Sequence, residues 1–350
     1  MLSFLAVVLV FGLVIFIHEL GHFTVAKLTG VKVVEFSLGM GPKLIGYKGK
    51  ETEYVLRALP VGGLCAMVGE PDGLQSGGEV CDESRRFDRQ PPRVRAAITV
   101  AGPVMNFVLA LVLFVLIYSI VGIPLGYSNR IQEVAPDGAA GAAGVLPGDR
   151  ITSVNGTDVS DWNGILLAIQ NHAGGEMDLV LDRDGDSRSV TLEPRLDPES
   201  GRQLIGIMTG PENLIWENLS PGEGISAGFR QTGVTFGVII QALREMFSGG
   251  VSVRDLSGPV GIVQTIAQTA QEGMVSLIFL TAFLSINIGI CNLLPIPALD
   301  GGRLLFILIE KIIRRPINPK KEGMIHLAGL VALLMLMVVV TYFDVLRLFN

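Results

Sequence analysis

The chain has 350 residues, of which 49% are hydrophobic and only 17% are charged, and its mean hydropathy is +0.51. This composition excludes an ordinary soluble protein and indicates a membrane protein. The net charge of −6 predicts no nucleic-acid partner, and three cysteines without paired spacing predict no disulfide framework.

The first apolar segment, residues 2–23, is long enough to cross a bilayer and contains the motif HELGH. His18 and His22 are four residues apart, so a helix presents both on one face, as half of a tetrahedral zinc site. Glu19 lies beside them, where it can take a proton from zinc-bound water. Ionisable groups at membrane depth are costly and usually functional. We therefore expect a zinc site, which also needs a third protein ligand.

The stretch after the first span alternates polar and apolar residues between glycines and prolines. We expect residues 53–60 to form a strand and residues 61–63 a turn into a returning strand. A hairpin with one apolar face can dip into the membrane beside the zinc site if protein or water satisfies its backbone. An ordinary cytoplasmic hairpin is the alternative. Residues 72–90 are polar and predict a loop.

The second predicted span, residues 96–123, begins with small residues that allow close helix packing. Asn106 lies within it, and a buried amide needs a hydrogen-bond partner. The sequence leaves two roles open for Asn106, namely bonding between helices or facing the active-site cavity.

A polar segment of different character follows. It predicts a strand from residue 131, a short Ala-rich helix, a strand at 150–154, an Asn-Gly turn, a helix at 162–172, a hairpin over 178–193 and a strand at 201–208. This order and the string A-x-x-A-G-V-x-x-G-D-x-I-x-x-V-N-G resemble a PDZ domain of the circularly permuted bacterial type. A PDZ domain binds an extended peptide at a sheet edge. We interpret His172 as a surface histidine of this domain.

Residues 221–250 carry polar residues at helical spacing, which favours an interfacial helix but leaves a fifth span open. The third span, residues 275–294, ends in NLLPIPALDGG, where prolines and glycines break the helix. Asp300 is the carboxylate of that apolar neighbourhood, and binding a cation would offset its cost. We therefore predict Asp300 as the third zinc ligand. Its rivals are Glu310, expected in a solvated ion pair, and His326 at the start of the fourth span.

The fourth predicted span covers residues 324–343. The charges of the segments between the spans predict how all four spans are oriented in the membrane. Residues 124–275 contain nine Arg, no Lys and nineteen acidic residues, whereas the short loop 303–321 contains six basic residues and one acid. Short basic loops stay in the cytoplasm. We therefore expect the acidic segment and both termini outside, with HELGH near the cytoplasmic face.

HELGH, GPVMNF in the second span, the PDZ-like segment and NLLPIPALDGG together resemble the site-2 protease family, and within it the bacterial RseP-type regulated intramembrane zinc metalloproteases. The resemblance covers nearly the whole chain, including the strings TEYVLRALPVGG and DLSGPVGI. Many relatives carry two tandem PDZ domains, whereas this chain has room for one.

The resemblance implies Zn²⁺ held by His18, His22 and Asp300, with Glu19 as the catalytic base. The candidate substrate contacts are Asn292, Pro297, Asn106, Pro60, Gly62 and Gly63. It also implies a multi-pass protein of the bacterial inner membrane. The implied partners are the lipid bilayer, single-pass membrane substrates such as anti-sigma factors or signal-peptide remnants, and a peptide at the PDZ domain.

We therefore predict a polytopic α-helical membrane protein with about four transmembrane helices, a membrane-associated β-hairpin and one inserted extracytoplasmic PDZ domain of α+β type. The predicted divisions are 1–123, 124–210 (PDZ), 211–274 (amphipathic linker region) and 275–350. The predicted function is an intramembrane zinc endopeptidase. The alternatives are a membrane-tethered PDZ scaffold or receptor with a non-catalytic metal site, and a transporter built on the helix break at 295–297. No internal repeat supports the transporter.

Overall fold

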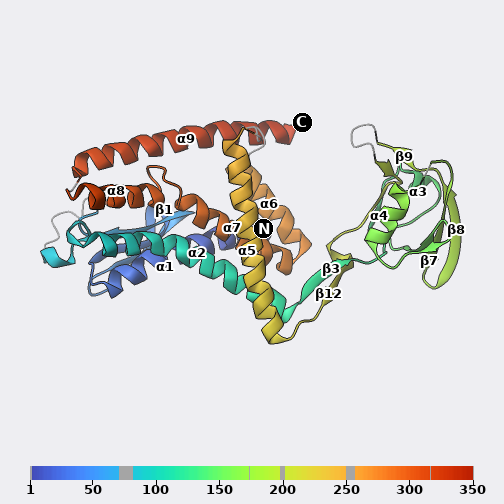
Figure 1. The fold of residues 1–350 in the computed structure, drawn as a ribbon, viewed down its shortest axis with the longest axis horizontal. Coiled ribbons are helices and arrows are strands. Elements are labelled where there is room, and N and C mark those ends of the chain that lie inside the picture. Colours follow the sequence, from blue (N-terminus) through green and yellow to red (C-terminus); the bar gives the residue numbers. More distant parts are fainter. Residues whose placement is uncertain are drawn as a thin grey trace. The chain divides into compact units, whose positions relative to one another are not determined.

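The computed structural model describes residues 2–70, 82–172, 174–197, 202–249, 257–315 and 317–349. The chain divides into two compact units (Figure 1). Residues 1–117 and 225–350 form the membrane unit, and residues 118–224 form the PDZ-like unit. Part of the loop predicted at 72–90, and Cys81 with it, falls outside the described residues. Its remainder forms two short 3₁₀ helices, η1 (Glu83–Arg85) and η2 (Phe87–Arg89).

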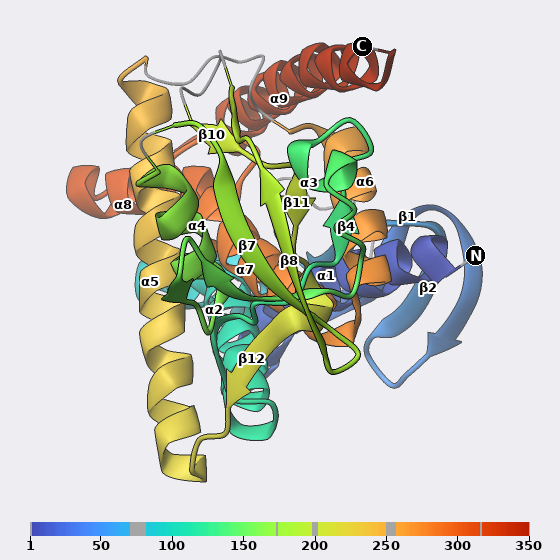
Figure 2. The same cartoon turned by 90° about the vertical axis from the view of Figure 1, so that its right-hand side faces the viewer.

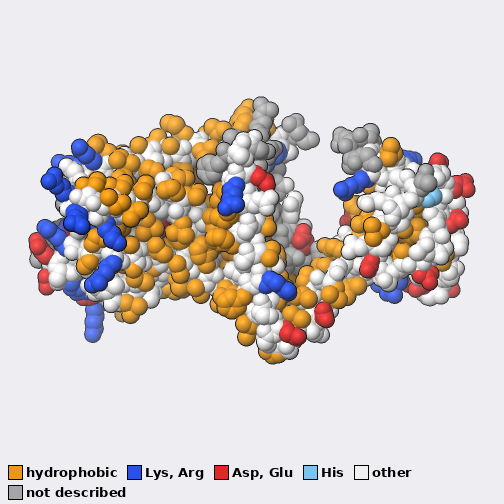
Figure 3. Space-filling model, in the orientation of Figure 1, with side chains coloured by type: hydrophobic (Ala, Val, Ile, Leu, Met, Phe, Trp, Pro, Cys, Tyr) orange, Lys and Arg blue, Asp and Glu red, His pale blue; other side chains and the backbone are white. Residues whose placement is uncertain are grey.

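Four helices of the membrane unit are long and apolar enough to cross a membrane, which confirms the four predicted spans. They are α1 (Leu2–Leu28), α2 (Pro92–Ile120), α7 (Met274–Asn292) and α9 (Pro319–Phe349). Apolar side chains cover much of the visible face of this unit, and Lys and Arg side chains gather at one end of it (Figure 3). Helix α5 (Pro221–Phe247) forms where an amphipathic helix was predicted, and it is not among the four candidate spans.

Two further helices complete the membrane unit. Helix α6 (Pro259–Glu272), which we did not predict, packs on α1, where Ala6, Val10 and Ile266 form a buried cluster. The carboxylate of Asp344 in α9 accepts hydrogen bonds from the backbone N–H groups of Gly258 and Gly261 at the start of α6. Helix α8 (Asp300–Ile313) begins at the predicted third ligand.

The hairpin after α1 consists of β1 (Val33–Lys48) and β2 (Glu53–Met67), and both strands bend back on themselves. Phe36 pairs with Tyr54 on one side and with Cys65 on the other, while Tyr47 also pairs with Tyr54. The chain turns back between residues 53–57 and 63–67, as predicted, but the returning segment pairs with residues 33–38 and not with residues 53–57. The result is four adjacent segments in the order 43–48, 53–57, 33–38 and 63–67, in which the two outer pairs run antiparallel and the central pair, 53–57 with 33–38, runs parallel.

Segment 63–67 is an edge of this sheet. In the described parts of the chain, it pairs with residues 33–38 on one side and with no strand on the other. The segment also lies close to α1, because Gly63 packs directly against the side chain of Glu19. The hairpin thus brings an unpaired strand edge to the HELGH motif.

The PDZ-like unit is built around a four-stranded antiparallel sheet in the order β6-β5-β7-β8, with α4 packed on it (Figure 2). Its buried core includes Ile151, Trp162, Ile165, Met177 and Leu179. The elements are β4 (Glu133–Val134), α3 (Ala139–Ala142), β5 (Arg150–Val154), β6 (Thr157–Asp158), α4 (Trp162–Gln170), β7 (Met177–Arg183), β8 (Asp186–Leu192), β9 (Arg195–Leu196), β10 (Gln203–Leu204) and β11 (Ile207–Met208).

Most of these elements follow the prediction, with two differences. The strand expected at 201–208 is two short strands, β10 and β11, which pair with β9 and β4. A ribbon that we did not predict, β3 (Ile123–Tyr127) with β12 (Leu214–Glu217), brings the chain into and out of the unit, and η3 (Pro211–Asn213) precedes β12. This ribbon lies partly outside the predicted 124–210 division.

Candidate metal centre

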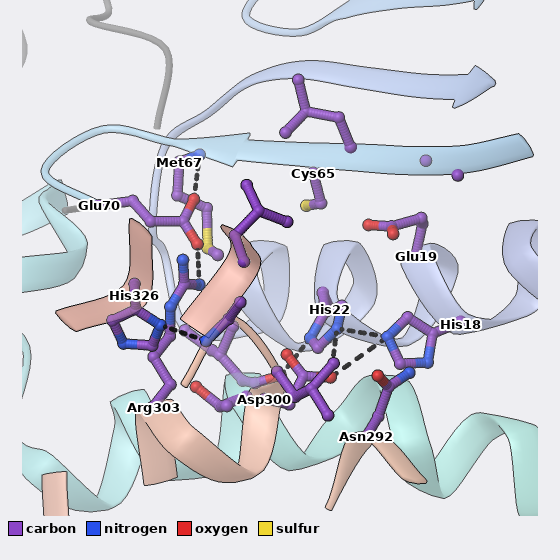
Figure 4. Close-up of a pocket in the computed structure, with 18 of the residues that line it drawn as sticks. His18, Glu19, His22, Cys65, Met67, Glu70, Asn292, Asp300, Arg303 and His326 are labelled. Atoms are coloured by element: carbon purple, nitrogen blue, oxygen red, sulfur yellow. Dashed lines mark hydrogen bonds and ion pairs between the residues drawn. The ribbon is translucent and has the colours of Figure 1, made fainter. Parts of the chain in front are cut away.

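Three side chains from two helices converge at one point of the membrane unit. Nε2 of His18 lies 3.2 Å from Nε2 of His22 and 3.2 Å from Oδ2 of Asp300, and Nε2 of His22 lies 3.5 Å from the same oxygen (Figure 4). Within the described part of the chain, this His–His–Asp cluster is the one group of three or more His, Cys, Asp or Glu residues arranged to hold a metal ion. The structure therefore brings together the three residues predicted as ligands.

The donor spacing fits zinc. Tetrahedral ligands at about 2.0–2.1 Å from Zn²⁺ lie roughly 3.3 Å from one another, and the three measured separations are 3.2, 3.2 and 3.5 Å. Asp300 Oδ2 is buried and makes no ordinary hydrogen bond, which suits an oxygen reserved for a cation. Two imidazoles and one carboxylate leave a fourth position open, as catalytic zinc sites require.

His22 is held by the backbone of α2. Its Nδ1 lies 2.8 Å from the carbonyl oxygen of Ile98, so Nδ1 carries the proton and Nε2 presents its lone pair to the cluster. Gly102, one turn further along α2, packs against both imidazoles. A Cβ atom at Gly102 would lie 2.3 Å from Nε2 of His22 and 2.9 Å from Cε1 of His18. Only glycine leaves room for the two ligands.

His18 is held by Asn106 of the same helix. The side-chain amide of Asn106 lies 3.3 Å from Nδ1 of His18, and Asn106 is completely buried. With the proton on Nδ1, as metal binding through Nε2 requires, the amide turns its oxygen toward the ring. Oδ1 of Asn106, otherwise buried without a partner, is then satisfied. Asn106 therefore lies behind a ligand and exposes no surface to a substrate.

The cluster lines a cavity of about 740 Å³. Glu19 lines it too and lies between α1 and the strand that carries Cys65 (Figure 4). A Cβ atom at Gly63 would lie 2.5 Å from Cγ of Glu19, so the backbone of β2 passes directly over this side chain. Gly62 and Asn292, both predicted substrate contacts, also line the cavity, and Asn292 lies beside His18.

The other sequence candidates lie elsewhere. Glu310 pairs with Arg95 of α2 and is partly buried, so it is in an ion pair, but not the solvated one that we expected with its helix neighbours. Pro297 packs against α9, and the side chain of Pro60 is outside the described part of the structure. His172 is half-buried in the PDZ-like unit and bonds to Asn155.

A partly buried ion pair on the cavity wall was not predicted from the sequence. Glu70, which follows β2, pairs with Arg303, one turn after Asp300, and also accepts a hydrogen bond from the N–H of Met67. Both charged residues line the cavity. The pair joins the hairpin to α8. No local pattern indicated it, because its partners are 233 positions apart.

Comparisons with known proteins agree with this geometry. The model of peptidase family M50 matches residues 6–336. The zinc metalloprotease RasP of Geobacillus kaustophilus is 33% identical, and the match covers 99% of this chain and 98% of that protein. The regulator of sigma-W protease RasP of Bacillus subtilis is 32% identical, with the same coverage. The crystal structure of a PDZ domain from a Listeria innocua SdrC-like protein aligns with 23% of this chain and 91% of that domain, at 21% identity and a TM-score of 0.21. The chain therefore belongs to peptidase family M50, and its His–His–Asp cluster is suited to a catalytic zinc ion.

Proposed function

We propose that this zinc metalloprotease cuts peptide bonds inside the membrane-spanning segments of other membrane proteins. One observation carries the proposal, namely that Glu19 and the His–His–Asp cluster share one cavity in the unit that contains all four candidate spans. An ionisable cluster of this kind is expensive at membrane depth unless it has a function.

The residues of the cavity divide the chemistry between them. His18, His22 and Asp300 would hold Zn²⁺, which when bound would lower the pKa of a water molecule toward about 7 and polarise the carbonyl to be attacked. Glu19 accepts the proton of the attacking water. It then passes this proton to the nitrogen of the leaving segment, so that the C–N bond breaks to give a neutral amine.

The hairpin supplies a place for the substrate backbone. An intact helix uses its own N–H and C=O groups internally, so a substrate helix must open before it can be cut. Segment 63–67 of β2 offers an unpaired edge beside Glu19, and an extended peptide can add to such an edge by main-chain hydrogen bonds. Gly62, Gly63 and Asn292 are the proposed contacts of this opened strand.

We also propose an orientation and a class of substrate. The PDZ-like unit, rich in acidic residues and free of lysine, faces the outside, and the basic loop after α8 faces the cytoplasm of a bacterial cell. The name of the Bacillus subtilis relative ties that protein to sigma-W. Single-pass anti-sigma factors are therefore the first substrates to test.

The test is cleavage of a tagged reporter by the purified chain in detergent. Two reporters should differ only in the apolar segment, one an unbroken leucine-rich helix and the other carrying an Asn-Pro pair at its centre. We expect the second to be cut faster, and a zinc chelator to stop both reactions. Absence of cleavage in every reporter, with zinc bound, would favour a PDZ scaffold with a non-catalytic metal site.

A further inference from the structure

The segment between α7 and α8 delivers Asp300 to the cluster, and its backbone is irregular at membrane depth. Backbone N–H groups there need partners, because lipid provides none. Within the segment, the N–H groups of residues 293, 294, 296 and 299 bond to nearby carbonyls, and Pro295 and Pro297 have none to donate. The N–H of Ala298 bonds to a different element.

That partner is His326 of α9. Its Nδ1 lies 2.9 Å from the backbone nitrogen of Ala298, and His326 is only 4% exposed. Ala298 has a φ of +78°, a left-handed conformation that is unfavourable for a non-glycine residue. The hydrogen bond from α9 therefore holds a strained residue two positions before a metal ligand.

A second contact from α9 reaches the same segment. Gly329 lies one turn after His326, on the same face of the helix. A Cβ atom at Gly329 would lie 2.5 Å from the carbonyl oxygen of Pro297 and 2.6 Å from its Cβ. The backbone of α9 thus packs directly on Pro297, so that helix and segment fit together without a gap.

We propose that His326 and Gly329 are positioning residues, which clamp residues 297–298 and thereby fix Asp300 for zinc binding. This role rests on the zinc site of the proposed function, and it makes α9 one of the elements that hold that site in place. His326 does not bind the metal itself, because it lies outside the His–His–Asp cluster. Its part is to accept the Ala298 N–H through Nδ1, in the tautomer that carries the proton on Nε2.

Two substitutions at His326 test the hydrogen bond. In His326→Asn, the amide oxygen stands on Cγ, where Nδ1 stands in histidine, so the acceptor is kept. In His326→Leu, the acceptor is lost and apolar bulk remains. We expect the Leu variant to lose zinc to a chelator about 10- to 100-fold more readily, the range for groups that orient metal ligands, and the Asn variant to recover most of the loss.

Two glycine substitutions on α9 test the packing. Gly329→Ala should weaken zinc retention, because the new methyl group forces Pro297 away from α9. Gly323→Ala is the matched control, since a Cβ atom at Gly323 meets nothing within 4 Å. The visible absorption of the Co²⁺-substituted full-length protein should lose its tetrahedral character in the Gly329 variant alone.

Metal retention separates this inference from the proteolytic function. Zinc content and dissociation rate can be measured whether or not any reporter is cut. The melting temperature of the metal-free protein shows whether a variant is folded. If His326→Leu melts lower without its metal but holds zinc like the wild type, the clamp serves stability alone and the proposal is wrong. Equal zinc loss in the Asn and Leu variants would also overturn it.

Discussion

The side-chain amide of Asn106 lies 3.3 Å from Nδ1 of His18, although 88 positions separate the two residues. The contact fixes the ring of a metal ligand from the side opposite the metal. Groups in this place set the tautomer of a histidine ligand and its basicity.

Replacing Asn106 with Leu should therefore weaken zinc binding about 10- to 100-fold while keeping the helix packing close to native. Zinc content after dialysis against a graded series of chelator concentrations measures the change. Ser285→Ala is the control, because the Ser285 hydroxyl donates to the backbone oxygen of Asn106 and not to its side-chain amide. Equal zinc retention in the Asn106 variant and the wild type would contradict the assignment.

Glu19→Gln should keep the metal and the fold but remove cleavage. The amide has nearly the shape of the carboxylate, yet it cannot accept the proton of water. Loss of a general base typically lowers a rate by about 10²–10⁴. Reporter cleavage and zinc content should be measured on the same preparation, and near-normal turnover by this variant would sink the assignment of Glu19 as the base.

Gly102→Ala should abolish zinc binding, because its methyl group would lie 2.3 Å from the position of His22 Nε2. Gly12→Ala in α1 provides the control, since a Cβ atom there meets nothing within 4 Å. Zinc analysis of the two purified variants decides the matter. Full zinc occupancy with alanine at position 102 would mean that α1 and α2 can separate at no cost to the site.

The parts of this site that the sequence predicted are those with a local signal. The spacing of His18, Glu19 and His22 along one helix predicted their roles. Asp300 was predicted because it is a carboxylate beside a broken span. The fold was predictable in the same way, from four apolar stretches and from the turn residues of the PDZ-like unit.

The supports of the ligands could not be predicted in this way. The Ile98 carbonyl, the space at Gly102 and the Glu70–Arg303 pair acquire meaning only when distant segments meet. Helix α6 was not predicted for a related reason. The side chain that accepts hydrogen bonds from the N–H groups at its start is Asp344, which lies 86 positions from Gly258, so no capping residue next to the helix indicated where it begins.

The stability of the PDZ-like unit should depend on pH through Asp149. This carboxylate is 1% exposed and bonds to Arg183 through two oxygens, at 2.7 and 2.8 Å, and to the N–H of Leu146. Burial opposes ionisation, but the bonds to Arg183 and Leu146 outweigh it and hold the pKa of Asp149 below its usual value.

A carboxyl group whose pKa is lowered by folding stabilises the fold at pH values above its pKa in the unfolded chain, which is about 3.9. This contribution is lost as the pH falls through the pKa of the group in the folded protein. We expect the stability of this unit to be steady from pH 7 to about 5 and to drop below about 4. Asp149→Asn should lower stability at pH 7, because it removes the carboxylate that accepts hydrogen bonds from Arg183 and from the N–H of Leu146, and should flatten the acid slope. Hydrogen exchange of β5 and β7 in the full-length protein reports both effects, and an unchanged acid slope in the variant would contradict this role for Asp149.

Deleting residues 131–208 should leave zinc binding intact and change which substrates are cut. No residue of the His–His–Asp cluster or of its supports lies in this unit, so the chemistry should survive. If the unit limits access, its loss should allow cleavage of reporters with bulky external domains that the full chain rejects. If it recruits a peptide end instead, the deletion should slow cleavage of a good substrate.

Full-length and pre-trimmed versions of one reporter separate these roles. If the unit limits access, the deletion variant should cut the full-length reporter as fast as the pre-trimmed one. Cutting rates unchanged for both reporters would show that the unit governs neither step.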